Sequence, residues 1–198
     1  MKITTVRHGQ TLWNHERRIQ GQSDIELDDV GLSQAEKLGN RLATEKIDII
    51  YTSNLKRAVK TAEIINNHHN AKFVTVTALR EMCYGTYEGC VFDNFQNELD
   101  YYYQNINTPM PEGESVMNVF DRIYGFLDEV VEKQYENIVI VSHYGVILTI
   151  ICYLLQVPPE ERERFMINNT AIHCFERKST GKFNMTIEND ISHLDYIT

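Results

Sequence analysis

Four basic side chains of this sequence, Arg7, His8, Arg57 and His143, stand at or shortly after the ends of short apolar segments. An arginine guanidinium presents a planar fork of donors that matches phosphate oxygens two at a time. A neutral imidazole is a competent nucleophile, and nearby cations keep it neutral by lowering its pKa. If the apolar segments lie side by side, these four side chains converge on one site. Such a site suits phosphoryl transfer, in which most catalysis is positioning and electrostatic stabilisation.

An acid is also needed, because a departing alkoxide takes up a proton. Glu81 is the best candidate, because it opens an irregular segment that we expect above the site. Each residue taken alone also has a structural interpretation: a histidine at a strand end usually serves packing, and Arg57 or Glu81 could form an ordinary ion pair. From the residues alone, the sequence therefore indicates an anion site and leaves its use open.

The elements that must position these residues follow from hydrophobic periodicity. Strands alternate with helices, which predicts an α/β fold of three layers, with a mostly parallel sheet and helices on both faces. Ligands of such sheets bind beyond the carboxyl ends of the strands, where the basic residues stand. The expected strands are residues 3–6, 48–52, 73–76 and 138–141, followed by a hairpin of residues 171–175 and 183–187 around Gly181. The expected helices follow caps at Asp28 and Ser53 and cover residues 116–131.

Length and charge set further limits. The 198 residues predict one domain, residues 1–198, in which residues 83–113, rich in Tyr, Asn and Pro, form an insertion or lid over the active site. A formal net charge of −9 argues against a broad basic face for nucleic acid or anionic lipid. Residues 138–155 carry no formal charge, but the interruption at residues 142–145 favours a buried strand and a buried helix over a membrane span.

The cysteines and the first residues bear on location. The four cysteines form no CxxC pair, so their spacing predicts neither a disulfide framework nor a zinc site. The first residues run directly into an expected strand, without the apolar region of a signal peptide. We therefore expect a cytoplasmic protein.

The motifs also carry a family resemblance. Residues 6–11 (VRHGQT) resemble the Arg-His-Gly signature of the histidine phosphatase superfamily, the phosphoglycerate-mutase-like enzymes. Four further matches follow in order, at residues 28–35 (DDVGLSQA), 53–63 (SNLKRAVKTAE), 79–89 (LREMCYGTYEG) and 141–143 (VSH). Arg-His-Gly alone is a weak motif, whereas five ordered matches over most of the chain are specific.

The resemblance implies that His8 is the phosphorylated nucleophile and Glu81 the proton donor. It implies that the phosphate pocket is completed by Arg7, Arg57 and His143. It further implies contacts to phosphate or substrate from Asn14, Gln20 and Tyr84. No metal or other cofactor is expected, because Arg and His replace the divalent cations used elsewhere. The implied substrate is a small-molecule phosphate monoester, with sugar phosphates, glycolytic acids and phosphorylated nucleosides all open.

Several alternatives stay open at this point. A cofactor-dependent phosphoglycerate mutase is the main rival of a phosphatase, although the mutases that this chain resembles carry larger insertions. A phosphate-binding module without turnover is less favoured, because nucleophile, acid and cradle residues are all present. Tyr144 stands where the family often has Gly; it could narrow the pocket, stack on an aromatic substrate or point into the core. The oligomeric state is open, with a homodimer as one option.

Overall fold

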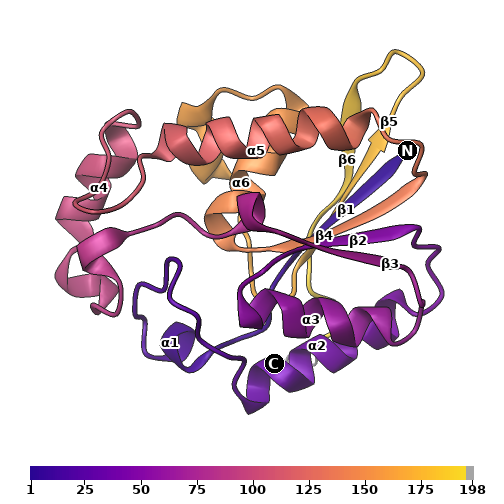
Figure 1. Cartoon of the computed structure of the whole chain (residues 1–198), viewed down its shortest axis with the longest axis horizontal. Helices are drawn as coiled ribbons and strands as arrows, with labels where there is room; N and C mark the ends of the chain where they lie inside the picture. The colour runs from indigo at the N-terminus through magenta and orange to yellow at the C-terminus, as the bar shows by residue number, and fades with distance from the viewer. Residues whose placement is uncertain (195–198) are drawn as a thin grey trace.

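A six-stranded mixed sheet forms the centre of the molecule (Figure 1). The computed structural model describes residues 1–194. The sheet has the strand order β3-β2-β4-β1-β5-β6; β3, β2, β4 and β1 are parallel, and β5 runs antiparallel to β1. This confirms the predicted α/β fold, with the hairpin at one edge. The strands are β1 (Lys2–Arg7), β2 (Ile49–Ser53), β3 (Lys72–Val76), β4 (Asn137–Ser142), β5 (Ile172–Arg177) and β6 (Phe183–Asp190).

Helices cover both faces of the sheet. The pair α2 (Asp29–Leu42) and α3 (Lys56–Asn66) packs on one face, and the pair α5 (Val116–Val131) and α6 (Tyr144–Leu155) packs on the other (Figure 1). The central strand β4 serves both layers. Its Ile138 and Ile140 belong to the core cluster of α5 and α6, whereas Val139 and Val141 belong to that of α2 and α3. Burial on both faces explains the uncharged run that the sequence analysis assigned to a strand and a helix.

The helix caps agree with the sequence at one position and differ at another. Asp28 caps α2, because its Oδ1 accepts a hydrogen bond of 2.7 Å from the Gly31 N–H. The prediction that Ser53 caps α3 is wrong. Ser53 is the last residue of β2, where it pairs with β3, and the helix begins at Lys56 without a side-chain cap. The strand thus outcompetes the local capping preference, and Arg57 becomes the second residue of the helix.

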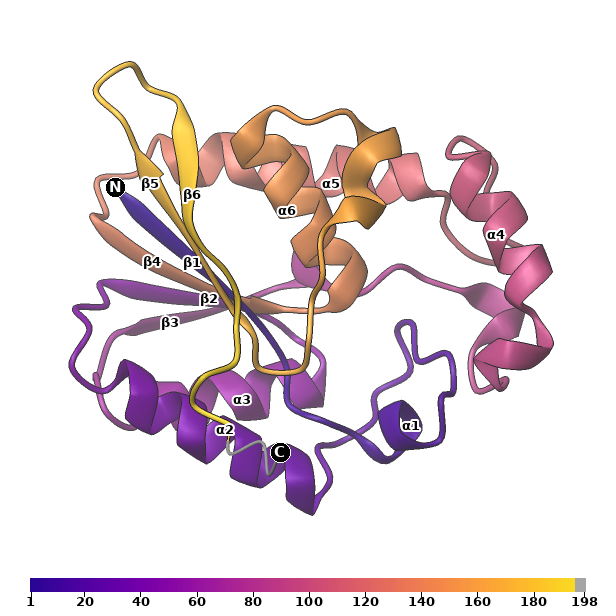
Figure 2. The same cartoon turned by 180° about the vertical axis from the view of Figure 1, so that it is seen from behind.

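Two short helices lie beyond the carboxyl ends of the parallel strands. These are α1 (Leu12–His15) and α4 (Gln96–Gln104), and both lie at the same end of the sheet in both views (Figures 1 and 2). The remaining turns are the 3-10 helices η1 (Thr77–Leu79), η2 (Gly85–Tyr87), η3 (Phe92–Asn94) and η4 (Pro159–Arg164). Within residues 1–194, none of the helices combines the length and the apolar character that crossing a membrane requires.

Candidate active site

The strand order brings the predicted basic residues together. Strand β4 lies between β1 and β2, so the carboxyl ends of all three adjoin. Arg7 ends β1 and His8 follows it, while His143 follows β4 and precedes α6. The rings of His8 and His143 lie 5.1 Å apart between centroids. The convergence that the sequence analysis expected is therefore present.

His8 is held as a neutral imidazole with a defined tautomer. Its side chain is buried, and its Nδ1 lies 2.7 Å from the carbonyl oxygen of Gly9, so Nδ1 carries the proton and donates it. The lone pair is then on Nε2. Burial, reinforced by the charges of Arg57 and Arg7, holds the pKa of His8 well below its ordinary value. A neutral ring with its lone pair on Nε2 is the form that can attack phosphorus.

Arg57 links the two histidines. Its Nε–H lies 3.2 Å from His8 Nε2 and 3.2 Å from His143 Nδ1. Its two terminal nitrogens donate to the carbonyl oxygens of Ser23 and Gly21, each at 2.7 Å. Burial is the main cause that lowers the pKa of Arg57 to about 10, so the guanidinium stays charged near neutrality. The long, shared bond to His8 Nε2 is one that a phosphoryl group can displace.

His143 offers a donor rather than an acceptor. Because its Nδ1 accepts from Arg57, the proton of the neutral ring lies on Nε2. That Nε2 is buried and has no hydrogen-bond partner among residues 1–194. Burial and the charge of Arg57 hold the pKa of His143 well below its ordinary value. An unpaired buried N–H is costly, and an anion beside His8 would satisfy it.

Arg7 supplies the second guanidinium. Its Nη1 donates to the carbonyl oxygen of Ile167 at 2.8 Å, and its Nε is buried without a partner in the described part of the chain. Its Cζ lies 5.6 Å from the ring centroid of Tyr144, which is 37% exposed. Tyr144 therefore does not point into the core, so this alternative of the three for this residue is excluded.

Glu81 is positioned by backbone groups. It is 8% exposed, its Oε1 accepts the N–H of Met82 at 2.9 Å, and its Oε2 accepts the N–H of Gly145 at 3.2 Å. Gly145 is the second residue of α6, so the amino end of this helix contacts the carboxylate. A Cβ at Gly145 would lie 2.8 Å from Glu81 Oε1, so a larger residue here would displace the carboxylate.

A cavity of about 800 Å³ lies over this cluster. Arg7, His8, Arg57 and Glu81 line it, whereas the fully buried His143 is not part of its wall. Much of the remaining wall is apolar or aromatic, and includes residues of the 83–113 insertion. The insertion contributes Tyr84, Phe92, Asp100, Tyr103, Gln104 and Ile106 to the wall.

The three predicted substrate contacts all line this cavity. Asn14 uses its Oδ1 to accept from Thr11 in a capping box of α1, which leaves its amide nitrogen for a ligand. The Oε1 of Gln20 is buried and unpartnered within residues 1–194. The Tyr84 hydroxyl lies 3.0 Å from the Tyr103 hydroxyl, and burial raises the pKa of Tyr84. Within the same residues, no group of three or more His, Cys, Asp or Glu side chains is arranged to hold a metal ion.

Sequence reasoning missed two residues that shape the site. Glu88 accepts from the backbone N–H groups of Gln22, Ser23 and Tyr84, and so ties the Arg57-binding loop to the acid segment. Its only signal was the Glu-Gly pair within the matched motif. Arg122 of α5 contacts the backbone of Glu81, and its only signal was a charge beside an apolar helix stripe.

Comparison with known proteins identifies the family to which the chain belongs. The sequence model described as histidine phosphatase superfamily (branch 1) matches residues 3–190. The chain belongs to the histidine phosphatase superfamily. Strands and site residues all lie inside the matched region, apart from Lys2, the first residue of β1. The resemblance found in the five motifs is thereby confirmed.

Relatives within this superfamily cover nearly the whole chain. The phosphoglycerate mutase-like protein 4 of Arabidopsis thaliana is 34% identical over 98% of this chain and 87% of its own length. The putative phosphoserine phosphatase 2 of Hydrogenobacter thermophilus is 34% identical over 90% of this chain and 92% of its own. A solved structure of an Entamoeba histolytica phosphoserine phosphatase mutant with phosphoserine superposes with a TM-score of 0.85, at 30% identity, over 98% of both chains.

Proposed function

We propose that this protein is a metal-independent phosphatase that hydrolyses small-molecule phosphate monoesters through a phosphohistidine on His8. The proposal fits the superfamily and its phosphatase relatives. One observation carries it: His8 lines the cavity as a neutral ring, with Nδ1 bonded to Gly9 and the lone pair on Nε2. The acid Glu81 lines the same cavity.

In the first step, His8 Nε2 attacks the phosphorus and the bond to the ester oxygen breaks. Glu81 in its protonated form gives its proton to that leaving oxygen, so that an alcohol departs. Arg7 and Arg57 stabilise the charge on the phosphoryl oxygens, and the unpaired Nε2–H of His143 donates to one of them. The arriving phosphoryl group replaces the long Arg57 Nε contact at His8.

In the second step, water attacks the phosphorus of the phosphohistidine. The Glu81 carboxylate takes a proton from the water, the P–N bond breaks, and inorganic phosphate leaves with His8 neutral again. We infer that the Asn14 amide nitrogen donates to the bound ester or water, and that Gln20 Oε1 accepts from it. Both residues line the cavity, and Gln20 Oε1 has no partner within residues 1–194. The cycle closes without any other reactant.

Hydrolysis is favoured over phosphoglycerate mutase activity by the charges of the cavity. Apart from Arg7 and Arg57, the cationic side chains in the described wall are Arg18 and Arg162. Arg18 pairs with Glu16 at 2.5 Å and Arg162 with Glu163 at 3.1 Å. A bisphosphate would therefore find no uncommitted cation for its second phosphate among the described residues.

We infer that residues 83–113 act as the lid of a single phosphatase domain. We also infer a cytoplasmic location, because the four free cysteines fit a reducing compartment.

The direct test is release of inorganic phosphate from p-nitrophenyl phosphate. His8→Ala is expected to lower the rate by at least about 10³-fold, because the nucleophile is lost. His15→Ala is the matched control, since this exposed histidine ends α1 outside the cavity wall. Equal rates for wild type and His8→Ala would refute the covalent mechanism. An inactive wild type on a broad monoester panel would favour the binding module instead.

A further inference from the structure

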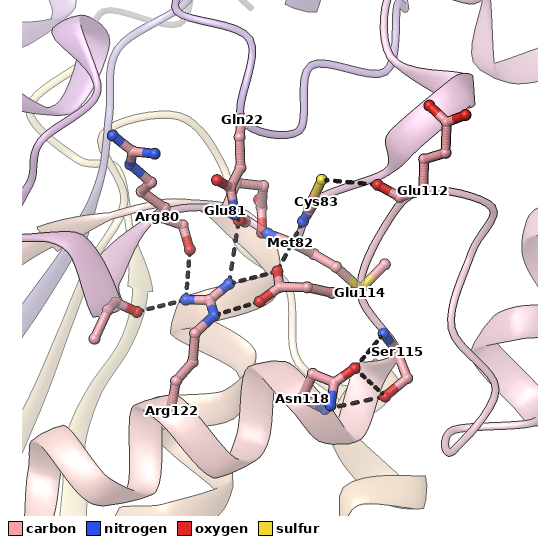
Figure 3. Close-up of polar contacts among 11 residues, drawn as sticks. Gln22, Arg80, Glu81, Met82, Cys83, Glu112, Glu114, Ser115, Asn118 and Arg122 are labelled. Carbon is pink, nitrogen blue, oxygen red and sulfur yellow. Dashed lines mark hydrogen bonds and ion pairs between the residues drawn. The ribbon is translucent and has the colours of Figure 1, made fainter.

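The acid segment has an irregular backbone whose carbonyl groups depend on side-chain donors. The 3-10 helix η1 ends at Leu79, and Glu81 follows without regular secondary structure. Buried carbonyl groups outside helices and sheets need other partners. One guanidinium, that of Arg122 in α5, donates to the carbonyl oxygens of Arg80 and Glu81 in this segment (Figure 3), and also to that of Ala78 in η1.

Arg122 is itself fixed by Glu114. Its Nη1 lies 2.8 Å from the Arg80 oxygen, and its Nη2 lies 3.1 Å from the Glu81 oxygen. Its Nε and Nη2 meet the two oxygens of Glu114 at 2.9 and 3.1 Å, which is a bidentate pair. Oε2 of Glu114 also accepts the N–H of Cys83 at 2.8 Å. The pair therefore holds the backbone on both sides of Glu81.

The position of the Glu81 carboxylate depends on this backbone. One of its oxygens is bonded to the N–H of the next residue, Met82, so it moves when the segment moves. Neither Arg122 nor Glu114 lines the active-site cavity, so neither side chain is placed to touch the substrate. Their side chains are only 20% and 22% exposed, and the same contacts close the base of the 83–113 insertion, where the Glu114 N–H donates to the Cys83 oxygen at 2.8 Å.

We propose that Arg122 and Glu114 are positioning residues that hold the general acid Glu81 in register with the leaving oxygen. This inference rests on the proposed function, since it requires Glu81 to be the acid. Arg122 uses the fork geometry of arginine, which the single ammonium of lysine cannot reproduce. A misplacement of about 1 Å in a catalytic group costs up to about 10²-fold in rate.

The test compares leaving groups. Arg122→Lys keeps the charge but loses the fork, and Glu114→Gln keeps the shape but loses the charge. In each variant, kcat/KM for an alkyl ester, glycerol phosphate, is expected to fall about 10- to 100-fold, because the alkoxide needs the proton. The kcat/KM for p-nitrophenyl phosphate is expected to stay within about 3-fold, since its leaving group needs little protonation and kcat/KM does not include the later hydrolysis of the phosphohistidine. Arg41→Lys is the matched control, on α2 in a looser ion pair of 3.8 Å with Asp190.

A double variant separates positioning from general loss of structure. Adding Arg122→Lys to Glu81→Gln should lower turnover of glycerol phosphate by no more than about 2-fold, because the acid is already absent. A full additional loss, or an equal loss on both substrates in the single variants, overturns the positioning role. Glu114→Gln serves as the independent variant if Arg122→Lys does not fold. If Glu81→Gln itself fails to discriminate between the two esters, the acid role fails; if only the Arg122 and Glu114 variants fail to do so, positioning alone is refuted.

Discussion

Replacing Gly145 by alanine should separate the stability of the fold from the placement of the acid. Gly145 is the second residue of α6, and its N–H donates to Glu81 Oε2. A Cβ there would lie 2.8 Å from Glu81 Oε1 and 3.7 Å from its carboxyl carbon. Apart from its two chain neighbours and the nearby backbone of its own helix, no other described atom lies within 4 Å. The substitution therefore acts on one side chain, the proposed acid.

The expected magnitudes follow from these distances. An ordinary contact begins at 3.4 Å, so the Glu81 oxygen must move by about 0.6 Å or its side chain must change rotamer. We expect kcat/KM on glycerol phosphate to fall about 10- to 100-fold, because a shift of this order misaligns the proton donor. Stability should not fall with it. Alanine is better than glycine by up to about 1 kcal/mol in a helix, which corresponds to a rise in Tm of about 2–4 °C.

The assay pairs kcat/KM measurements on glycerol phosphate and p-nitrophenyl phosphate with thermal unfolding. Gly125→Ala in α5 is the matched control, because a Cβ there meets nothing within 4 Å. It should raise Tm similarly and leave the ratio of the two rates unchanged. A Gly145→Ala protein that keeps the wild-type ratio would refute the placement of Glu81. A marked loss of Tm would refute the claim that only this side chain is displaced.

Three further predictions concern the loop, the rim and the charge state of the site. Gly21 has φ +52°, and a Cβ there would lie 2.1 Å from Glu88 Oε1. Gly21→Ala should therefore lower the free energy of unfolding in urea by about 1–3 kcal/mol and also lower kcat. An unchanged urea midpoint would refute the strain. Tyr144→Ala should raise KM for the ester about 2- to 30-fold, because it removes the contact between the aromatic ring and Arg7. Tyr144→Phe keeps the ring, so its KM should stay within about 2-fold of wild type. Equal KM values in the two variants would refute a role for this ring contact. The lowered pKa of His8 means that the unfolded chain binds more protons than the folded one below about pH 6.5, so stability falls as pH falls through this range. His8→Gln should remove this contribution, which is at most about 2 kcal/mol at pH 5 for an unfolded pKa of about 6.5; a pH profile of urea unfolding parallel to wild type would contradict a neutral His8.

The sequence predicted the site best where the chemistry follows from strand ends. Parallel strands end at one edge of a sheet, so placing three apolar segments sufficed to bring Arg7, His8 and His143 together. The uncharged residues of β4 and α6 also indicated a central strand, because a strand that is buried on both faces carries few charges. Hydrophobic periodicity and the position of a residue at a strand end can both be read from the local sequence.

The rest depends on contacts between distant segments. Ser53 reads locally as a helix cap, yet pairing with β3 extends the strand through it. The role of Arg57 as a bridge depends on the carbonyl groups of Gly21 and Ser23, whose loop is shaped by Glu88, 65 residues beyond Ser23. A hydrogen bond to a backbone carbonyl oxygen requires no particular residue type, so the sequence does not reveal it. The same holds for Arg122, whose partners are main-chain oxygens.

The most direct measurement of the central claim is to trap the intermediate. Wild-type protein is mixed with ³²P-labelled p-nitrophenyl phosphate, quenched rapidly at alkaline pH and digested for peptide mapping. The mechanism predicts an acid-labile label on the peptide that contains His8, and its absence in His8→Ala. A label recovered only on Ser or Thr, or the same labelling of His8→Ala, would contradict the phosphohistidine.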